Sequence, residues 1–199
     1  MPSNIILAFD TSAAHCAAAL LWDDKVLLRH EPMAKGQAER LMPLLEEMLA
    51  EAGIGWADLC AIGVGTGPGN FTGVRISVAA ARGLALGLGV PAIGVTAFEA
   101  LAFGTQHPVS VVMDARQDEV YVQRFADHTP GPAQLIAAAA RPVGDVIGLG
   151  GAAPVFPIAE AIARITALRF RAPQPRPAPF YLRSANAAPP TDPPPVILP

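Results

Sequence analysis

The sequence predicts an α/β protein in which a mixed sheet carries helices on its faces and a second, smaller lobe follows. Apolar runs of strand length alternate with longer amphipathic stretches of helical period as far as residue 103. The first three runs are separated only by turns, whereas the later ones alternate with helices. After a short linker, two further strand-like runs come as a hairpin. This order indicates a mixed sheet first and a smaller lobe second.

The N-terminal part begins as an antiparallel meander, because turn residues separate its three apolar runs. These runs cover residues 4–9, 15–22 and 26–30. An amphipathic helix is predicted next, at residues 37–53. Its apolar face consists of Leu41, Leu44, Leu45, Met48, Leu49 and Ala52. Pro43 is expected to kink or delay its first turns, and Gly53 is a C-cap candidate.

The remaining elements follow from apolar periodicity and capping signals. Thr96 and Glu99 form a capping box at the start of a short helix. The predicted strands are 59–65, 91–95, 109–113, 120–125 and 146–149, and the predicted helices are 74–88, 97–103 and 157–168. Ten of the 27 residues from 173 to 199 are proline, which predicts an extended tail. The expected divisions are an N-terminal lobe at 1–103, a smaller C-terminal lobe at 104–172 and the Pro-rich tail at 173–199.

Composition indicates a globular protein without a strong affinity for nucleic acid of its own. The chain has 199 residues, is 52% hydrophobic and 16% charged, and carries a net charge of −3. RNA binding through the backbone needs clustered Lys and Arg, although a basic partner could still present RNA to the chain. Cys16 and Cys60 lie far apart, which is typical of a reduced cytosolic protein. No signal peptide is indicated, and the most membrane-like stretch, 83–98, is shorter than the roughly 20 residues that span a bilayer. A soluble, cytoplasmic protein is expected.

The most informative stretch is a Gly-rich loop at residues 63–75, which holds five glycines and a proline. It is not a Walker A loop, because Val74 and Arg75 follow its last glycine in place of Lys and Ser or Thr. It is either a tight strand-to-helix connection or an anion site at a helix N-terminus. Phe71 is unusually large and apolar for a loop tip. Arg75 is a cation at the positive end of a helix and is expected to have a partner elsewhere.

Small residues recur every four positions in the predicted helix 74–88, at Ala79, Gly83 and Gly87. Glycine inside a helix costs about 1 kcal/mol against alanine. The stripe therefore indicates that another backbone packs close against it. That backbone belongs either to the sheet of the same chain or to a helix of a second subunit, and the spacing alone favours neither.

The side chains that could carry catalysis are few. The four histidines, His15, His30, His107 and His128, stand alone, so no metal site is predicted. No Gly-x-Ser-x-Gly nucleophile elbow is present. Asp10 and Asp114 each follow a predicted strand, where a carboxylate can hold hydrated Mg²⁺ or simply cap its own turn. A small ATP-dependent phosphotransferase that uses these two aspartates is the alternative function.

Five segments together resemble the TsaB (YeaZ) family. They are residues 6–12, 37–43, 65–76, 113–121 and 179–183, and they include Asp-Thr-Ser at 10–12 and the pattern Gly-Pro-Gly-x-Phe-Thr-Gly-x-Arg at 67–75. The resemblance implies the two-lobed actin/Hsp70/sugar-kinase fold. It also implies a non-catalytic subunit in the formation of N6-threonylcarbamoyladenosine at position 37 of tRNAs that read codons starting with A. A metallo-glycopeptidase, suggested by older naming of the family, is disfavoured by the isolated histidines.

The resemblance further implies partners and an interface. The chain would pair with a TsaD-type paralogue, recruit a TsaE-type ATPase, reach tRNA indirectly through the complex and form a homodimer when alone. Helices 37–53 and 73–88 would make the contact. The interface residues expected on them are Arg40, Leu41, Leu44, Leu45, Met48, Val74, Ala79, Arg82, Gly83, Leu86 and Gly87.

The resemblance also marks a vestigial nucleotide or phosphate site. Its expected members are Asp10, Thr11, Ser12, Gly67, Gly69, Asn70, Thr72 and Asp114. The chain departs from family patterns at Gln37-Ala38, where many relatives have His-Ser, and at Asn70, where many have Ser. A family element that carries an aspartate appears here as Leu149-Gly150-Gly151-Ala152, without that carboxylate. No cofactor is expected in the chain itself, while ATP or ADP at the interface of the complex stays open.

Overall fold

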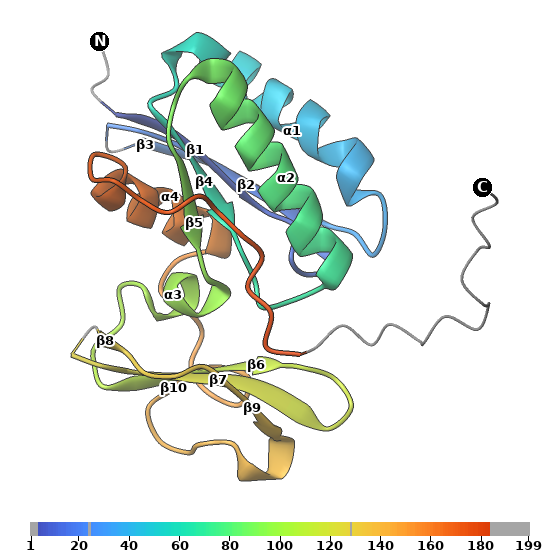
Figure 1. The fold of residues 1–199 in the computed structure, drawn as a ribbon, viewed down its shortest axis with the longest axis vertical. Coiled ribbons are helices and arrows are strands. Elements are labelled where there is room, and N and C mark those ends of the chain that lie inside the picture. The colour runs from blue at the N-terminus through green and yellow to red at the C-terminus, as the bar shows by residue number, and fades with distance from the viewer. Residues whose placement is uncertain (1–3, 24, 128, 184–199) are drawn as a thin grey trace, which may run out of the picture.

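Five strands form the sheet of the N-terminal lobe in the computed structural model, which describes residues 4–23, 25–127 and 129–183 (Figure 1). The strand order is β3-β2-β1-β4-β5. Their bounds are Ile5–Asp10 (β1), His15–Trp22 (β2), Lys25–Pro32 (β3), Ala61–Gly65 (β4) and Ala92–Val95 (β5). The first three pair antiparallel, which confirms the predicted meander, and β1, β4 and β5 run parallel. The sheet is therefore mixed, as the sequence predicts.

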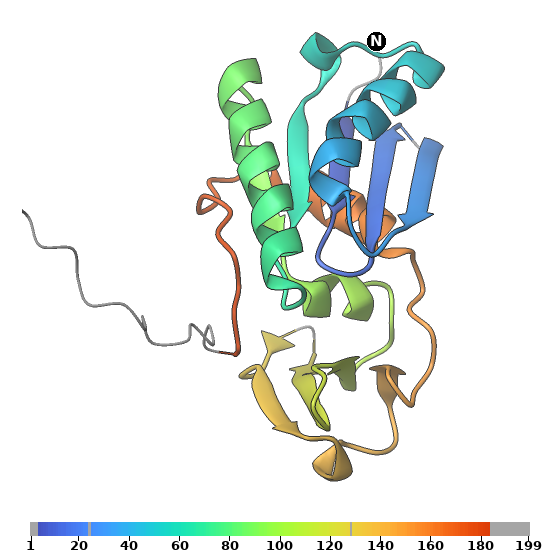
Figure 2. The same cartoon turned by 90° about the vertical axis from the view of Figure 1, so that its right-hand side faces the viewer.

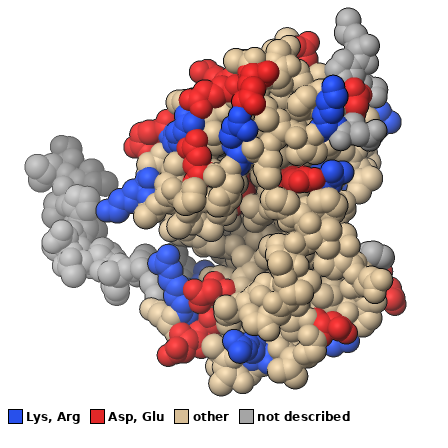
Figure 3. Space-filling view, turned by 180° about the vertical axis from the view of Figure 1, so that it is seen from behind, with Lys and Arg blue, Asp and Glu red and all other residues tan. Residues whose placement is uncertain are grey.

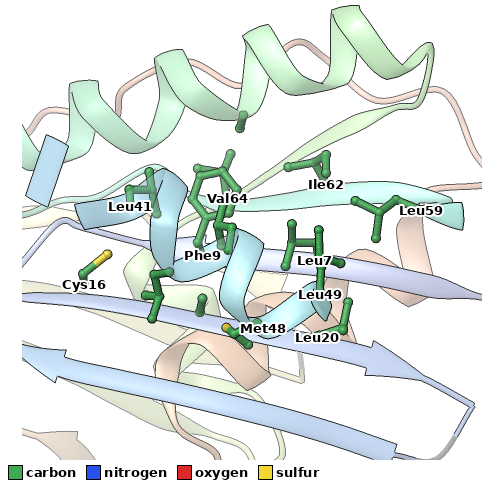
Figure 4. Close-up of a cluster of buried hydrophobic side chains, with 14 of the residues drawn as sticks. Leu7, Phe9, Cys16, Leu20, Leu41, Met48, Leu49, Leu59, Ile62 and Val64 are labelled. Carbon is green, nitrogen blue, oxygen red and sulfur yellow. The ribbon is translucent and has the colours of Figure 1, made fainter. Parts of the chain in front are cut away.

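Helices cover both faces of this sheet because alternate side chains of its central strands are apolar on both sides. Leu7 and Phe9 of β1 point into a core with α1 (Gln37–Ala52) and α2 (Phe71–Leu88), shown in Figure 4. Ile6 and Ala8 point the other way, into a second core. By length and composition α2 could cross a membrane, but four of its residues, Val74, Val78, Ala81 and Ala85, belong to the first core.

The second core corrects the predicted domain boundary. Helix α4 (Ile158–Arg169) was expected in the lobe at 104–172, yet Ala159, Ile162 and Ile165 pack against the N-terminal sheet. Figure 1 shows α4 on the side of that sheet opposite to α1 and α2. The physical reason is that the face formed by Ile6 and Ala8 is apolar and needs a cover. The chain therefore returns to the first lobe after completing the second.

The second lobe is a smaller sheet. Its predicted hairpin is confirmed as β6 (Val109–Asp114) and β7 (Glu119–Ala126), which pair antiparallel. β10 (Val146–Gly148) pairs parallel with β6, so this sheet is mixed as well. Two short strands that the sequence does not predict, β8 (Thr129–Pro130) and β9 (Gln134–Ala137), pair with β7. Helix α3 (Ala97–Ala102) lies between the lobes and gives Ala100 to one core and Phe98 to the other.

Residues 173–183, here called the strap, run extended across both lobes without regular secondary structure. The backbone N–H of Phe180 donates to the Thr66 carbonyl at 2.8 Å, which fixes the strap to the Gly-rich loop. Arg183 donates to the Ala115 carbonyl at 3.0 Å and pairs with Glu119 in the second lobe. The first part of the predicted tail is thus extended and docked, and the rest of it, 184–199, lies outside the described residues.

Candidate functional site

The Gly-rich loop leads directly into α2, which begins three residues earlier than predicted. Asn70 is its N-cap, and the side-chain oxygen of Asn70 accepts a hydrogen bond from the Gly73 N–H at 2.9 Å. Asparagine is among the strongest N-cap residues, so Asn70 is the sequence signal that marks this earlier start. The cap satisfies one of the helix's free N–H groups.

The glycines of the loop accommodate the turn between β1 and β2. Thr11 Oγ1 donates to the Gly73 carbonyl at 2.6 Å, and the Asn70 N–H donates to the Ser12 carbonyl at 2.6 Å. A Cβ at Gly69 would overlap the Ser12 carbonyl oxygen, and one at Gly73 would overlap that of Thr11. These glycines are therefore needed for a close approach of the chain's own backbone.

Asp10 is fully buried at the end of β1. Its Oδ2 accepts hydrogen bonds from the Ser12 N–H at 3.1 Å and Oγ at 2.9 Å, and it pairs with His15 Nε2 at 2.8 Å. Its Oδ1 has no hydrogen-bond partner among the described residues and lies where a Cβ at Gly65 would be. In the sequence, His15 stands alone. Only the tight turn into β2 brings its ring to Asp10, and the ring also contacts His30 at a centroid distance of 4.9 Å.

Asp114, the second aspartate of the alternative function, is exposed and caps its own turn. Its Oδ1 accepts a hydrogen bond from the Arg116 N–H at 3.0 Å. The glycines of the segment at 149–152 and its flank also pack on their own chain. A Cβ at Gly148 would overlap the Val112 carbonyl, and one at Gly151 would overlap the Val146 carbonyl. Of the residues expected to hold a nucleotide, Asp10, Thr11, Ser12, Asn70 and Asp114 therefore make hydrogen bonds within their own chain. Across the described ranges, no group of three or more His, Cys, Asp or Glu side chains could hold a metal ion.

The two cysteines are free. Burial raises the pKa of the Cys16 thiol to about 11, and the neighbouring Glu31 carboxylate acts in the same direction. A thiol with so high a pKa stays protonated near neutral pH and is a poor nucleophile. Cys16 is thus a core residue of β2.

Five of the expected interface residues are core residues, which corrects the sequence-based assignment. They are Leu41, Leu44, Leu45, Met48 and Val74, and none is more than 1% exposed. An amphipathic helix on a sheet buries its apolar stripe against that sheet, and the first lobe's sheet takes this stripe of α1 (Figure 4). These side chains stabilise the fold and do not face a partner.

The other five expected residues of α2 form a continuous exposed stripe. We call this stripe, consisting of Ala79, Arg82, Gly83, Leu86 and Gly87, the outer face of α2. A Cβ added at Gly83 or Gly87 would meet nothing within 4 Å, so the small residues do not pack on the chain's own sheet. Of the two explanations for the stripe, the intramolecular one is wrong. Leu86 is 77% exposed beside them.

Arg40 is half-buried and already bound within the chain. Its guanidinium reaches Glu31 on β3 at 2.7 Å and Glu47 on α1 at 2.6 Å. Hydrogen bonds from Arg40 hold the pKa of both carboxyl groups below their ordinary value of 4.5. Figure 3 shows acidic side chains gathered over α1, whose exposed residues include Glu39, Glu46, Glu47 and Glu51. The outer side of α1 is therefore acidic, unlike the outer face of α2.

Arg75 has the distant partner that its position at a helix N-terminus suggested. Its guanidinium lies 3.7 Å from the centroid of the Phe71 ring, and its Nε donates to the Tyr181 hydroxyl at 3.1 Å. The rings of Phe71 and Tyr181 are 5.0 Å apart. Phe71 and Arg75, in the first turns of α2, thus hold the strap against this helix.

Two mixed sheets, joined by α3 and with helices on both faces of the first, define a two-lobed protein with the actin-like nucleotide-binding fold. Residues 31–187 match the family described as TsaD: tRNA N6-adenosine threonylcarbamoyltransferase. YeaZ from Pseudomonas aeruginosa has a similar structure, with a TM-score of 0.73 and 29% identity over 90% of this chain and 100% of that one. An uncharacterised protein of Mycobacterium tuberculosis is 36% identical over 94% of this chain and 95% of its own.

Relatives that carry a functional name show which family this is. The tRNA threonylcarbamoyladenosine biosynthesis protein TsaB of Escherichia coli is 38% identical over 122 residues, which are 58% of this chain and 52% of that protein. The chain belongs to the TsaB (YeaZ) family.

Proposed function

We propose that this chain is a non-catalytic subunit in the biosynthesis of N6-threonylcarbamoyladenosine in tRNA, and that it pairs with a TsaD-type protein through the outer face of α2. Relatives named for this biosynthesis support the pathway. In the same proposal, the chain is cytoplasmic, forms a homodimer when alone and recruits a TsaE-type ATPase once paired.

The openness of Gly83 and Gly87 is the observation that carries the proposal. Glycine on the exposed face of a helix lowers the stability of that helix, and these two glycines pack against nothing in the monomer. Without side chains there, a second helix can approach α2 closely, and Leu86 supplies an apolar contact beside them. Arg82 adds a guanidinium to this face, and arginine is enriched at protein interfaces.

The closed environment of Asp10 supports the non-catalytic role. One carboxylate oxygen is engaged by Ser12 and His15, and the other is buried against Gly65. A carboxylate that orients Mg²⁺ and a nucleotide has to reach them.

Reconstitution with purified components tests the proposal. The chain, a TsaD-type protein, a TsaE-type ATPase, threonylcarbamoyl donor and an unmodified tRNA that reads codons starting with A are mixed, and nucleoside formation is measured by mass spectrometry. We expect product only when this chain and the TsaD-type protein are both present.

Each protein is also assayed alone as a control. Modification of tRNA by this chain alone, or Mg-ATP turnover by it that disappears in Asp10→Ala, would contradict the proposal and favour the enzyme alternative.

A further inference from the structure

An open groove of about 570 Å³ lies between the C-terminal half of α2, edge strand β5 and residues 170–177. Arg82, Arg171 and Arg176 line it, together with apolar residues that include Leu86, Phe170 and Pro177. No aspartate or glutamate is among the residues that line it. We call it the arginine groove. In a chain whose net charge is −3, it gathers three positive charges.

The charge of the groove is not neutralised within the described part of the chain. Arg82 and Arg176 make no ion pair there, and Arg171 donates only to the neutral Asn4 Oδ1, at 2.9 Å. Five of the nine other arginines are paired with carboxylates: Arg29, Arg40, Arg164, Arg169 and Arg183. The arginines of the groove therefore stay available to an external anion.

The walls suit a nucleic acid in particular. A guanidinium matches a phosphate group with two parallel hydrogen bonds, and it does so better than an ammonium does. The Phe170 ring, with the Arg171 guanidinium 5.4 Å from its centroid, and the exposed Leu86 offer surfaces on which a base or a ribose can lie. An open groove lined with cations and apolar rings tracks a phosphate backbone.

We propose that the arginine groove binds the phosphate backbone of the substrate tRNA directly. This inference rests on the proposed function. It differs from the sequence-based expectation of indirect contact through the complex, because the tRNA here binds a surface of this chain. The groove shares Arg82 and Leu86 with the outer face of α2, so a bound RNA would pass along the rim of the paired TsaD-type protein. Figure 2 shows α2 between the strap and α1, so the acidic outer side of α1 would repel RNA from the opposite flank.

The test uses Arg171→Glu/Arg176→Glu in the pair with the TsaD-type protein. Both side chains are exposed and lie outside the outer face of α2, so the fold and the pairing are expected to persist. Binding of an unmodified tRNA transcript is titrated at several salt concentrations. We expect the affinity of the pair for tRNA at 0.1 M salt to fall at least about tenfold. The slope of log affinity against log salt concentration should become shallower by roughly one to two, because fewer ions are released when the RNA binds.

The matched control is Arg116→Glu/Arg124→Glu, which changes the net charge equally at exposed positions of the second lobe. The affinity of this variant for tRNA is expected to fall by less than about threefold. Equal losses in the two variants, or an unchanged affinity in Arg171→Glu/Arg176→Glu, would overturn the inference.

Pairing is measured separately, without RNA, so that the two proposals are judged apart. If the wild-type chain does not pair, the proposed function fails. The wild-type chain could pair while Arg171→Glu/Arg176→Glu does not, with the affinity for tRNA unchanged. In that case the groove is a protein-docking surface, and the RNA inference is wrong.

Discussion

Single side chains in this protein are often committed to their own chain where the sequence suggests a partner or a substrate. Arg40 bridges Glu31 and Glu47, and so ties β3 to α1. Asp10 binds its own turn and His15. A carboxylate at the end of a strand can therefore have a purely structural role, because the same group that could hold a metal can also fix a turn.

The Arg40 bridge predicts a pH dependence of stability. Because the folded pKa of Glu31 and Glu47 is lowered, their contribution is present above the ordinary carboxyl pKa and is lost as pH falls through the folded values. In Arg40→Met, which keeps an apolar stem, thermal unfolding from pH 6 to pH 3 should show a shallower loss of Tm than in the wild type. Parallel curves for the two proteins would show that the bridge does not contribute to stability.

At the scale of elements, α2 has two kinds of glycine. A Cβ added at Gly73 would overlap the Thr11 carbonyl, whereas one added at Gly83 would contact nothing within 4 Å. The first is needed for packing and the second is not. Both lie in the same helix, so they form a matched pair for experiment.

Alanine at these two positions should change stability in opposite directions. Gly73→Ala forces the β1–β2 turn away and is expected to cost about 1–3 kcal/mol of unfolding free energy. Gly83→Ala improves helix propensity without a clash and should gain up to about 1 kcal/mol. Chemical denaturation of both variants measures this. A loss at Gly83 comparable with that at Gly73 would mean that the outer face of α2 packs within the monomer.

Local periodicity was sufficient to predict the meander, the hairpin and the main helices, because amphipathic stripes and capping signals are contained in neighbouring residues. It could not say which surface covers each stripe. The apolar face of α1, with Leu44 and Leu45, was expected at an interface and instead faces the sheet. Helix α4 packs on the first lobe although it follows the second in sequence. The Asp10–His15 pair depends on the register of β1 and β2, which a search for motifs does not reveal.

The whole molecule is two lobes joined by α3 and held by the strap. Arg75 and Tyr181 fix the strap to the first lobe, and Arg183 fixes it to the second. This arrangement leaves the outer face of α2 uncovered and places the arginine groove beside it. The proposed division of work follows from this geometry: the chain supplies docking and RNA contact, and the partner supplies chemistry.

The affinity of the Gly83→Leu variant for the TsaD-type protein, measured by calorimetry, tests the docking claim most directly. The added side chain points into open space in the monomer and improves helix propensity, so Tm should not fall. In the complex it would hold the second helix away, and affinity is expected to fall at least about thirtyfold, the effect of losing an interface hot spot. Ala139→Leu, an exposed position of the second lobe, should bind as the wild type does. Wild-type affinity in a folded Gly83→Leu protein would contradict the account.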